Sequence, residues 1–333
     1  MRKESNLSFI TWLRASSAIL ILLCHYCARC EYPLISVLSM VFNIGVQLFF
    51  IMSGFLVGYK GITKPYSKWY RKRLNRIFIP FWMFLFVLAI VHAANNISLL
   101  SVDWLFLVLG LQGTVVNVWG AEQTWFISVL LLCYLLSPLI LDLTQRVSAS
   151  HNSWLRAISI MAVCIMPIAY AFFEAPWVYT VFTPVSLYIM SCVYGVTYNP
   201  EKRFTYKKTL LALFVVAVSF CLRFAAKLFC DGTILYDRIV VPYSQTFAAY
   251  AIVYIFEAIF STRRIPPFVQ FVSNISFEIY LYHYMFVQEP IALFGYFSNW
   301  VVGCIVVTSL VLPLSFVANR VSTAISRKQY TRL

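Results

Sequence analysis

Long apolar segments alternate with short polar segments along the whole chain, and most of the polar segments are basic. A helix needs about 20 mainly apolar residues to cross the hydrocarbon core of a bilayer, which is roughly 30 Å thick. By this criterion we predict an all-α polytopic membrane protein with about ten transmembrane helices. The predicted spans are residues 8–27, 37–59, 77–94, 122–143, 157–174, 177–198, 209–230, 242–260, 272–290 and 299–319.

One further apolar segment, residues 103–116, is too short to cross a bilayer. We predict that it forms a re-entrant or interfacial helix on the outer side. With this segment outside, the predicted cytoplasmic segments contain 21 of the 26 Lys and Arg residues, whereas the outer loops contain only Arg29 and Arg238. This asymmetry follows the positive-inside rule and predicts that both termini are cytoplasmic.

The composition agrees with a membrane protein. Of the 333 residues, 61% are hydrophobic and 11% are charged, whereas soluble proteins contain about 25% charged residues. A soluble enzyme is therefore excluded, and we expect a single transmembrane domain over residues 1–333, surrounded by membrane lipids. Because the topology accounts for most of the net charge of +14, this charge does not indicate nucleic-acid binding. Cys24, Cys27 and Cys30 lack a second ligand motif, so we predict no metal site.

Apart from His92 near the outer end of its span, three basic residues and two histidines remain inside the predicted spans, and Arg14 and His25 are the most informative of them. Ionisable groups in the hydrocarbon core usually face a cavity, a partner or a water path. Arg14 and His25 lie about three helical turns apart, so they share one helix face at a separation of about 16 Å along the axis. A cation and a titratable base in this arrangement suit a long anionic donor that enters from the cytoplasm. Alternatively, Arg14 extends to the interface and His25 makes one interhelical hydrogen bond.

Arg223 and Lys227 lie one turn apart near the outer end of their predicted span. Arg223 can hold an anionic glycan or pair with an acidic residue. Lys227 can equally extend to the interface. The acidic residues considered for the pairing are Asp231, Asp237 and Glu289.

Arg73 and Arg76 stand out within residues 60–76, a basic segment that we predict to be a cytoplasmic loop. Two arginines one turn apart at the entrance of a helix can together hold phosphate groups. Ordinary orientation charge and attraction to anionic lipid also explain most of this segment. The more specific interpretation is that Arg73 and Arg76 bind a phosphate-bearing cosubstrate on the cytoplasmic side.

Five segments between residue 14 and residue 283 carry candidate motifs. The segments are Arg14 with His25; Gly45-Val46-Gln47-Leu48-Phe49-Phe50-Ile51-Met52-Ser53-Gly54-Phe55-Leu56; Arg73-Leu74-Asn75-Arg76-Ile77-Phe78-Ile79-Pro80; Trp125-Phe126-Ile127-Ser128 with Tyr134-Leu135-Leu136-Ser137-Pro138; and Ser276-Phe277-Glu278-Ile279-Tyr280-Leu281-Tyr282-His283. Together, and in this order, they resemble the motifs of the membrane acyltransferase 3 family, whose bacterial members acylate sugars of cell-surface and exported glycans.

The resemblance implies a membrane-embedded O-acyltransferase of the bacterial cytoplasmic membrane, of the class that transfers groups other than amino-acyl groups. It implies acyl-CoA, most simply acetyl-CoA, as the donor and a sugar hydroxyl as the acceptor. The sugar would belong to a capsule, an O-antigen, another exported polysaccharide or a lipid-linked precursor. Arg14, Arg73 and Arg76 would hold the CoA phosphates. His25 would act as the general base or carry the acyl group briefly.

Four further residues are candidates for contacts with the substrate. His283 can line the same cavity or form structural hydrogen bonds, and Tyr280 lies on the same helix face. Glu122 is the carboxylate nearest to the tryptophan motif, and Trp125 can stack on a sugar ring. The chain departs from the family pattern at Gln123, because many members have a histidine before the tryptophan.

Two further points concern the function and the extent of the chain. Some relatives add an extracytoplasmic esterase-like domain, and we expect none here. The alternative function is export of a polysaccharide or a lipid-linked oligosaccharide, because polar residues near the middle of the membrane also suit transport. Against this alternative, the sequence shows no internal repeat.

Overall fold

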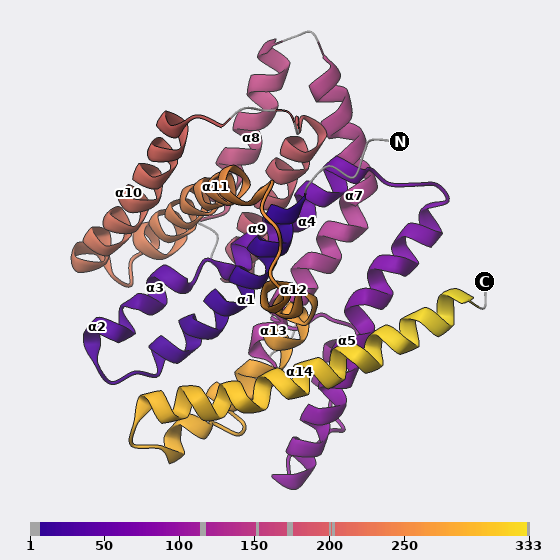
Figure 1. Ribbon diagram of the computed structural model, residues 1–333, viewed down its shortest axis with the longest axis vertical. Coiled ribbons are helices and arrows are strands. Elements are labelled where there is room, and N and C mark those ends of the chain that lie inside the picture. The colour runs from indigo at the N-terminus through magenta and orange to yellow at the C-terminus, as the bar shows by residue number, and fades with distance from the viewer. Residues whose placement is uncertain are drawn as a thin grey trace. The chain divides into compact units, whose positions relative to one another are not determined.

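The computed structural model describes residues 7–113, 118–150, 153–171, 176–199, 201 and 204–331, and these residues are mainly helical (Figure 1). The all-α prediction is therefore confirmed for the described residues. The helices are α1 (Ser8–Ala28), α2 (Pro33–Ser36), α3 (Leu38–Phe42), α4 (Gly45–Lys60), α5 (Tyr66–Ala94), α6 (Val102–Val108), η1 (Glu122–Thr124), α7 (Trp125–Ala149), α8 (Ser153–Ala171), α9 (Pro176–Val196), α10 (Tyr206–Cys230), η2 (Tyr236–Val240), α11 (Val241–Phe260), α12 (Pro267–Asn274), α13 (Ser276–Val287), η3 (Leu293–Tyr296) and α14 (Trp300–Thr331).

Seven helical segments in the described part of the chain are long and apolar enough to cross a bilayer. Two shorter apolar stretches, Ala157–Ile168 and Val181–Val196, lie in α8 and α9. These features support a multi-pass membrane protein, whereas the count of ten spans and the cytoplasmic termini stay predictions. The seven segments are Ser8–Ala28, Pro33–Lys60, Tyr66–Ala94, Glu122–Ala149, Tyr206–Cys230, Tyr236–Phe260 and Trp300–Arg327.

Two of the predicted spans are not single helices. Residues 37–59 are divided between α3 and α4, because the backbone of Asn43 leaves the helical region at φ −70° and ψ 46°. Residues 272–290 are divided between α12 and α13 at Ile275, and α13 has 12 residues, too few to cross a bilayer alone. Apolar residues continue through both regions, so hydropathy does not mark the breaks.

The prediction of a loop over residues 60–76 was wrong for most of that segment. Helix α5 begins at Tyr66, directly after the extended backbone of Pro65, and continues to Ala94. Lys and Arg favour helices strongly, so a run of basic residues does not end one. Arg73 and Arg76 consequently lie within α5 rather than at the entrance of a helix.

The apolar segment 103–116 forms no long helix in its described part, which agrees with the prediction that it does not span the bilayer. Its helix α6 has seven residues, and the Ser101 hydroxyl accepts a hydrogen bond from the Trp104 backbone N–H at its start. Leu105 is 60% exposed. Trp82 Nε1 donates to the carbonyl oxygen of Val108 at 3.0 Å. A short helix with exposed apolar side chains suits a membrane interface.

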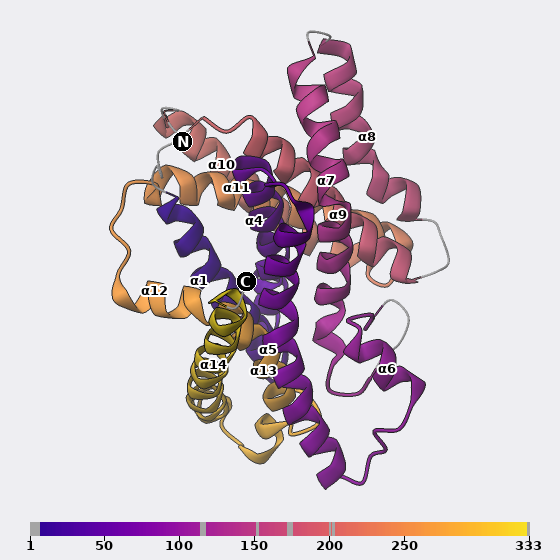
Figure 2. The ribbon, with the colours of Figure 1, turned by 90° about the vertical axis from the view of Figure 1, so that its right-hand side faces the viewer.

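The helices form two compact units whose segments are interleaved along the chain. In unit 1, α4 packs against α9 and α10 packs against α11. In unit 2, α5 and α13 both pack against α14, and Figure 2 shows α5 lengthwise and α14 nearly along its axis. Unit 1 comprises Met1–Ser17, Ile44–Ile62 and Leu135–Gln270, and unit 2 comprises Ala18–Asn43, Thr63–Tyr134 and Phe271–Leu333.

Glycine residues allow α4 and α9 of unit 1 to pack backbone against backbone. A Cβ atom added to Gly54 would lie 2.2 Å from the carbonyl oxygen of Tyr188, and one added to Gly58 would lie 2.1 Å from that of Cys192. Helices in membranes associate closely through small residues spaced in this way. The Ser-Gly-Phe-Leu segment thus contributes to packing through Gly54.

We expect the Gly54→Ala variant to unfold at a lower temperature than the wild type. Alanine gains about 1 kcal/mol of helix propensity, but the Cβ clash with a main-chain oxygen forces two helices apart, and overpacking costs about 1–3 kcal/mol or more. Thermal unfolding of the detergent-solubilised protein measures the difference. Gly295→Ala is the matched control, because nothing lies within 4 Å of its added Cβ. Equal losses in both variants would contradict the packing explanation.

Candidate active site

A pair of histidine rings lies in unit 2, one from the last turn of α1 and one from α13. The ring centroids of His25 and His283 are 5.0 Å apart, with an angle of 46° between the ring planes. Tyr284 packs edge-on against His25 at 5.3 Å. The sequence left two roles open for His283, and the structure places it beside His25 rather than in a separate part of the unit.

The buried environment of His283 determines which ring nitrogen carries hydrogen. His283 is 0% exposed, and its Nδ1 lies 3.0 Å from the carbonyl oxygen of Ile279 and 2.8 Å from that of Tyr280. Carbonyl oxygens only accept hydrogen bonds, so Nδ1 must be the donor. In the neutral ring, Nε2 then has a free lone pair, and it has no hydrogen-bond partner among the described residues. His283 therefore presents a proton acceptor inside the unit.

His25 differs from His283 because its side chain is only partly buried. Within the described residues it contacts the rings of His283 and Tyr284 and makes no hydrogen bond. Arg29, one turn further along the chain, is exposed and interacts with it electrostatically. Helix α1 is continuous from Ser8 to Ala28, so Arg14 lies on the same helix as predicted. His25 can consequently reach a ligand, while His283 stays behind it.

Two reciprocal hydrogen bonds join η1 to α13 next to the histidine pair. The Tyr280 hydroxyl donates to the carbonyl oxygen of Gln123, and Gln123 Nε2 donates to the carbonyl oxygen of Leu281 at 2.9 Å. Both side chains are buried, at 3% and 5% exposure. The Tyr280 hydroxyl thereby fixes the position of α13, and with it His283, whereas a contact between Tyr280 and substrate stays a prediction.

Glu122 and Trp125 lie on either side of this junction. Glu122 is partly exposed, but its Oε2 atom is buried without a hydrogen-bond partner among the described residues. The Glu122 carboxylate and Arg29 both interact electrostatically with the hydroxyl of Tyr284. Trp125 begins α7 and is also partly exposed. These positions leave Glu122 close to the ring cluster and able to accept a hydrogen bond from a ligand.

Arg73 is held by two aromatic rings in unit 2. Its guanidinium carbon lies 5.5 Å from the ring centroid of Trp69 and 5.4 Å from that of Tyr134. Cation–π contacts of this kind fix the plane of a guanidinium group without using its N–H donors. The contact also connects the Arg73 segment to the Tyr134-Leu135-Leu136 segment, two of the motifs that carry the family resemblance.

Arg76 lies three residues after Arg73 and is exposed. It interacts electrostatically with Glu278 of α13, which is 3% exposed. Glu278 Oε1 accepts a hydrogen bond from Asn319 Nδ2 at 2.9 Å, and the same nitrogen donates to the carbonyl oxygen of Asn274. A polar network therefore connects the arginine-bearing helix α5 with α13 and α14.

The remaining predicted residues, Arg14 and Arg223, belong to unit 1. Arg14 is partly buried. Arg223 is 5% exposed in α10, so its side chain is buried within unit 1, and a contact with a glycan stays a prediction. Lys227 Nζ lies 3.6 Å from Oδ2 of Asp231, one of the acidic residues considered as partners of Arg223.

Sequence reasoning missed three residues of this region: Gln123, Tyr284 and Trp69. Gln123 was noted only as a departure from the family pattern, although that departure was itself a signal. Tyr284 follows a candidate histidine directly, but nothing in the sequence shows that its ring contacts His25. Trp69 precedes Arg73 by about one turn, and the spacing becomes informative only once a helix replaces the predicted loop.

These observations define a multi-pass helical membrane protein with a pair of packed imidazole rings. A family model described as an acyltransferase domain matches residues 7–320, which include segments of both units. The chain therefore belongs to the acyltransferase 3 family, and the resemblance is confirmed. No curated protein and no solved structure matches the chain significantly. Family membership makes the protein a membrane acyltransferase.

Proposed function

We propose that the protein transfers an acyl group, most simply acetyl, from acyl-CoA to a sugar hydroxyl of a cell-surface or exported polysaccharide. Family membership supports the reaction class. The observation that carries the proposal is the histidine pair, in which an accessible imidazole contacts a buried one with a free Nε2. Transfer to a hydroxyl requires a base, and a neutral imidazole can accept the proton of the hydroxyl.

In the proposed reaction, His25 accepts the proton of the sugar hydroxyl while the hydroxyl oxygen attacks the thioester carbonyl carbon. The carbon–sulfur bond breaks, and His25 returns the proton to the departing thiolate. The products are the sugar ester and CoA with a free thiol. When His25 holds the proton, its ring has two N–H groups, and His283 Nε2 can accept one of them.

The donor is proposed to bind through its phosphate groups. Arg73 and Arg76 lie on α5 and offer guanidinium donors, and Trp69 and Tyr134 hold Arg73 in one orientation. Arg14 of α1 stays a separate predicted contact for the donor. Guanidinium groups match phosphate oxygens geometrically, and orientation by aromatic rings reduces the entropy lost on binding. Glu122, with its free Oε2, is proposed to bind an acceptor hydroxyl.

The test uses the full chain, purified in detergent, with radiolabelled acetyl-CoA and the polysaccharide of the host cell. We expect alkali-labile label in the polysaccharide and release of one CoA thiol for each acetyl group transferred. No ion gradient exists in detergent, so transfer there favours the enzyme over export. Thiol release without labelled polysaccharide would show hydrolysis only, and would contradict the sugar acceptor. Absence of both products would contradict the donor.

A further inference from the structure

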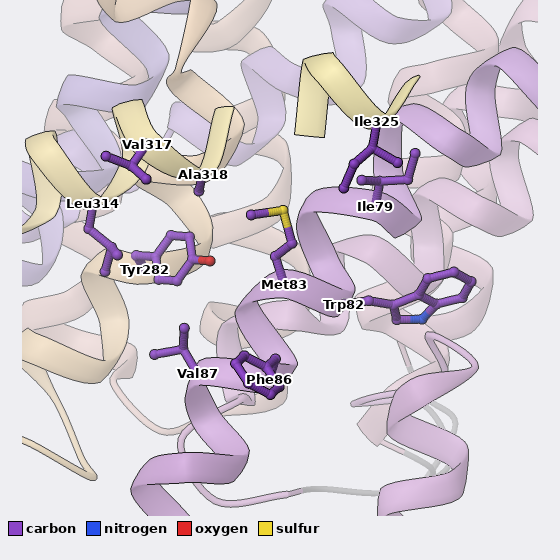
Figure 3. Close-up of a pocket in the computed structure, with 10 residues that line it drawn as sticks. All are labelled: Ile79, Trp82, Met83, Phe86, Val87, Tyr282, Leu314, Val317, Ala318 and Ile325. Carbon is purple, nitrogen blue, oxygen red and sulfur yellow. The ribbon is translucent and has the colours of Figure 1, made fainter. Parts of the chain in front are cut away.

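A groove in unit 2 is lined by α5 and α14, and Tyr282 of α13 lies between their side chains (Figure 3). Its volume is about 480 Å³, and its walls are almost entirely carbon. Tyr282 contributes a hydroxyl that makes no hydrogen bond with the described residues. Tyr282 directly precedes His283, but the groove residues do not include either histidine. The walls come mainly from Met83, Phe86 and Val87 of α5 and from Leu314 and Val317 of α14.

Side chains that line the groove are exposed at the surface of unit 2. Phe86 is 69% exposed and Val317 is 56% exposed, and both belong to helices long and apolar enough to cross a bilayer. In a membrane, exposed apolar side chains of this kind face hydrocarbon rather than water. The natural occupant of such a groove is therefore a hydrocarbon chain.

The two helical stretches that line the groove are each about as long as one leaflet of the hydrocarbon core is thick. The groove residues extend from Ile79 to Val87 on α5 and from Leu314 to Ile325 on α14. At 1.5 Å per residue these stretches are about 12 and 16 Å long, and half of a hydrocarbon core is about 15 Å. A phospholipid acyl chain fits this length, whereas a long isoprenoid chain exceeds it.

One end of the groove is basic. Lys72 and Arg76 continue the α5 stripe that lines the groove, because spacings of four, three and four residues separate Lys72, Arg76, Ile79 and Met83. Both basic side chains are exposed, and the acidic group that interacts with Arg76 is the buried Glu278. A phosphate at this end would meet two cations directly beyond the apolar walls.

We propose that the groove binds one acyl chain of an anionic membrane phospholipid, with the lipid phosphate at Lys72 and Arg76. The apolar walls determine where the chain lies, and the two cations select an anionic headgroup. The proposed lipid site shares Arg76 with the proposed donor site, so lipid binding is measured without acyl-CoA and its outcome does not depend on acyl transfer.

The test is native mass spectrometry of the purified full chain, after lipid removal and addition of phosphatidylglycerol or phosphatidylcholine with identical chains. We expect the wild type to bind phosphatidylglycerol more tightly than phosphatidylcholine, by about fivefold for each cation that contacts the lipid phosphate. Val317→Trp fills the groove and should bind one lipid fewer. Val301→Trp is the matched control, because Val301 is on the same helix, is 53% exposed and does not line the groove; it should bind as the wild type does.

A second variant keeps the test decisive if Val317→Trp does not fold. Lys72→Gln combined with Arg76→Gln leaves the apolar walls intact, and should bind both lipids with equal affinity. The proposal is overturned if phosphatidylglycerol and phosphatidylcholine bind the wild type equally, or if Val317→Trp retains every bound lipid. Copurification of an isoprenoid phosphate that Val317→Trp loses would also overturn it, because the occupant would then be a different lipid.

Discussion

Replacing His25 with alanine is expected to lower kcat for acyl transfer by about 10²–10⁴-fold, the usual contribution of a general base. The His25 ring is partly exposed, contacts the buried His283, and makes no hydrogen bond within the described residues. Alanine offers no atom that can take the proton of the acceptor hydroxyl. Initial rates of label transfer, at equal concentrations of purified protein, measure the loss.

Two comparisons separate the loss of a base from a loss of structure. Added imidazole should restore part of the rate of His25→Ala, because a small imidazole can occupy the space left by the ring. Arg14→Ala alters the same helix, but it is expected to raise KM for acetyl-CoA more than it lowers kcat. If His25→Ala retains wild-type kcat, His25 is not the base and the proposed mechanism fails.

The sequence predicted the features that depend on local order along the chain. The helical period predicted that Arg14 and His25 lie on one helix, and α1 contains both residues. The apolar segments predicted most of the long helices. It did not predict the breaks at Asn43 and Ile275, because apolar residues occupy both sides of each break. Helix breaks in apolar sequence depend on tertiary packing, which a hydropathy profile does not describe.

The contacts of the site could not be derived from spacing, because they join segments that are far apart in the chain. His25 contacts His283, and Gln123 forms hydrogen bonds with α13. The residues of each contact are far apart in the sequence, so helical periodicity cannot predict that they meet. The position of Arg73 between Trp69 and Tyr134 has the same origin. The family resemblance grouped these segments by function, whereas the structure shows which side chains meet.

His283 provides the second large expected effect, because two substitutions separate the functions of its ring nitrogens. Asparagine places an amide near Nδ1, so it can still donate to the carbonyl oxygens of Ile279 and Tyr280 but lacks the acceptor at Nε2. Glutamine places an amide oxygen near Nε2 and retains that acceptor. We therefore expect His283→Asn to lose more activity than His283→Gln.

For His283→Asn we expect kcat to fall by about 10–150-fold, which corresponds to one hydrogen bond to a charged group, with little change in KM for acetyl-CoA. His283→Gln should stay closer to the wild type, because its oxygen can still stabilise protonated His25. A purely structural role for His283 predicts the reverse order: asparagine would preserve activity and thermal stability, and glutamine would lose both, because only the contacts of Nδ1 support α13. Steady-state kinetics and thermal unfolding of the two variants distinguish these outcomes.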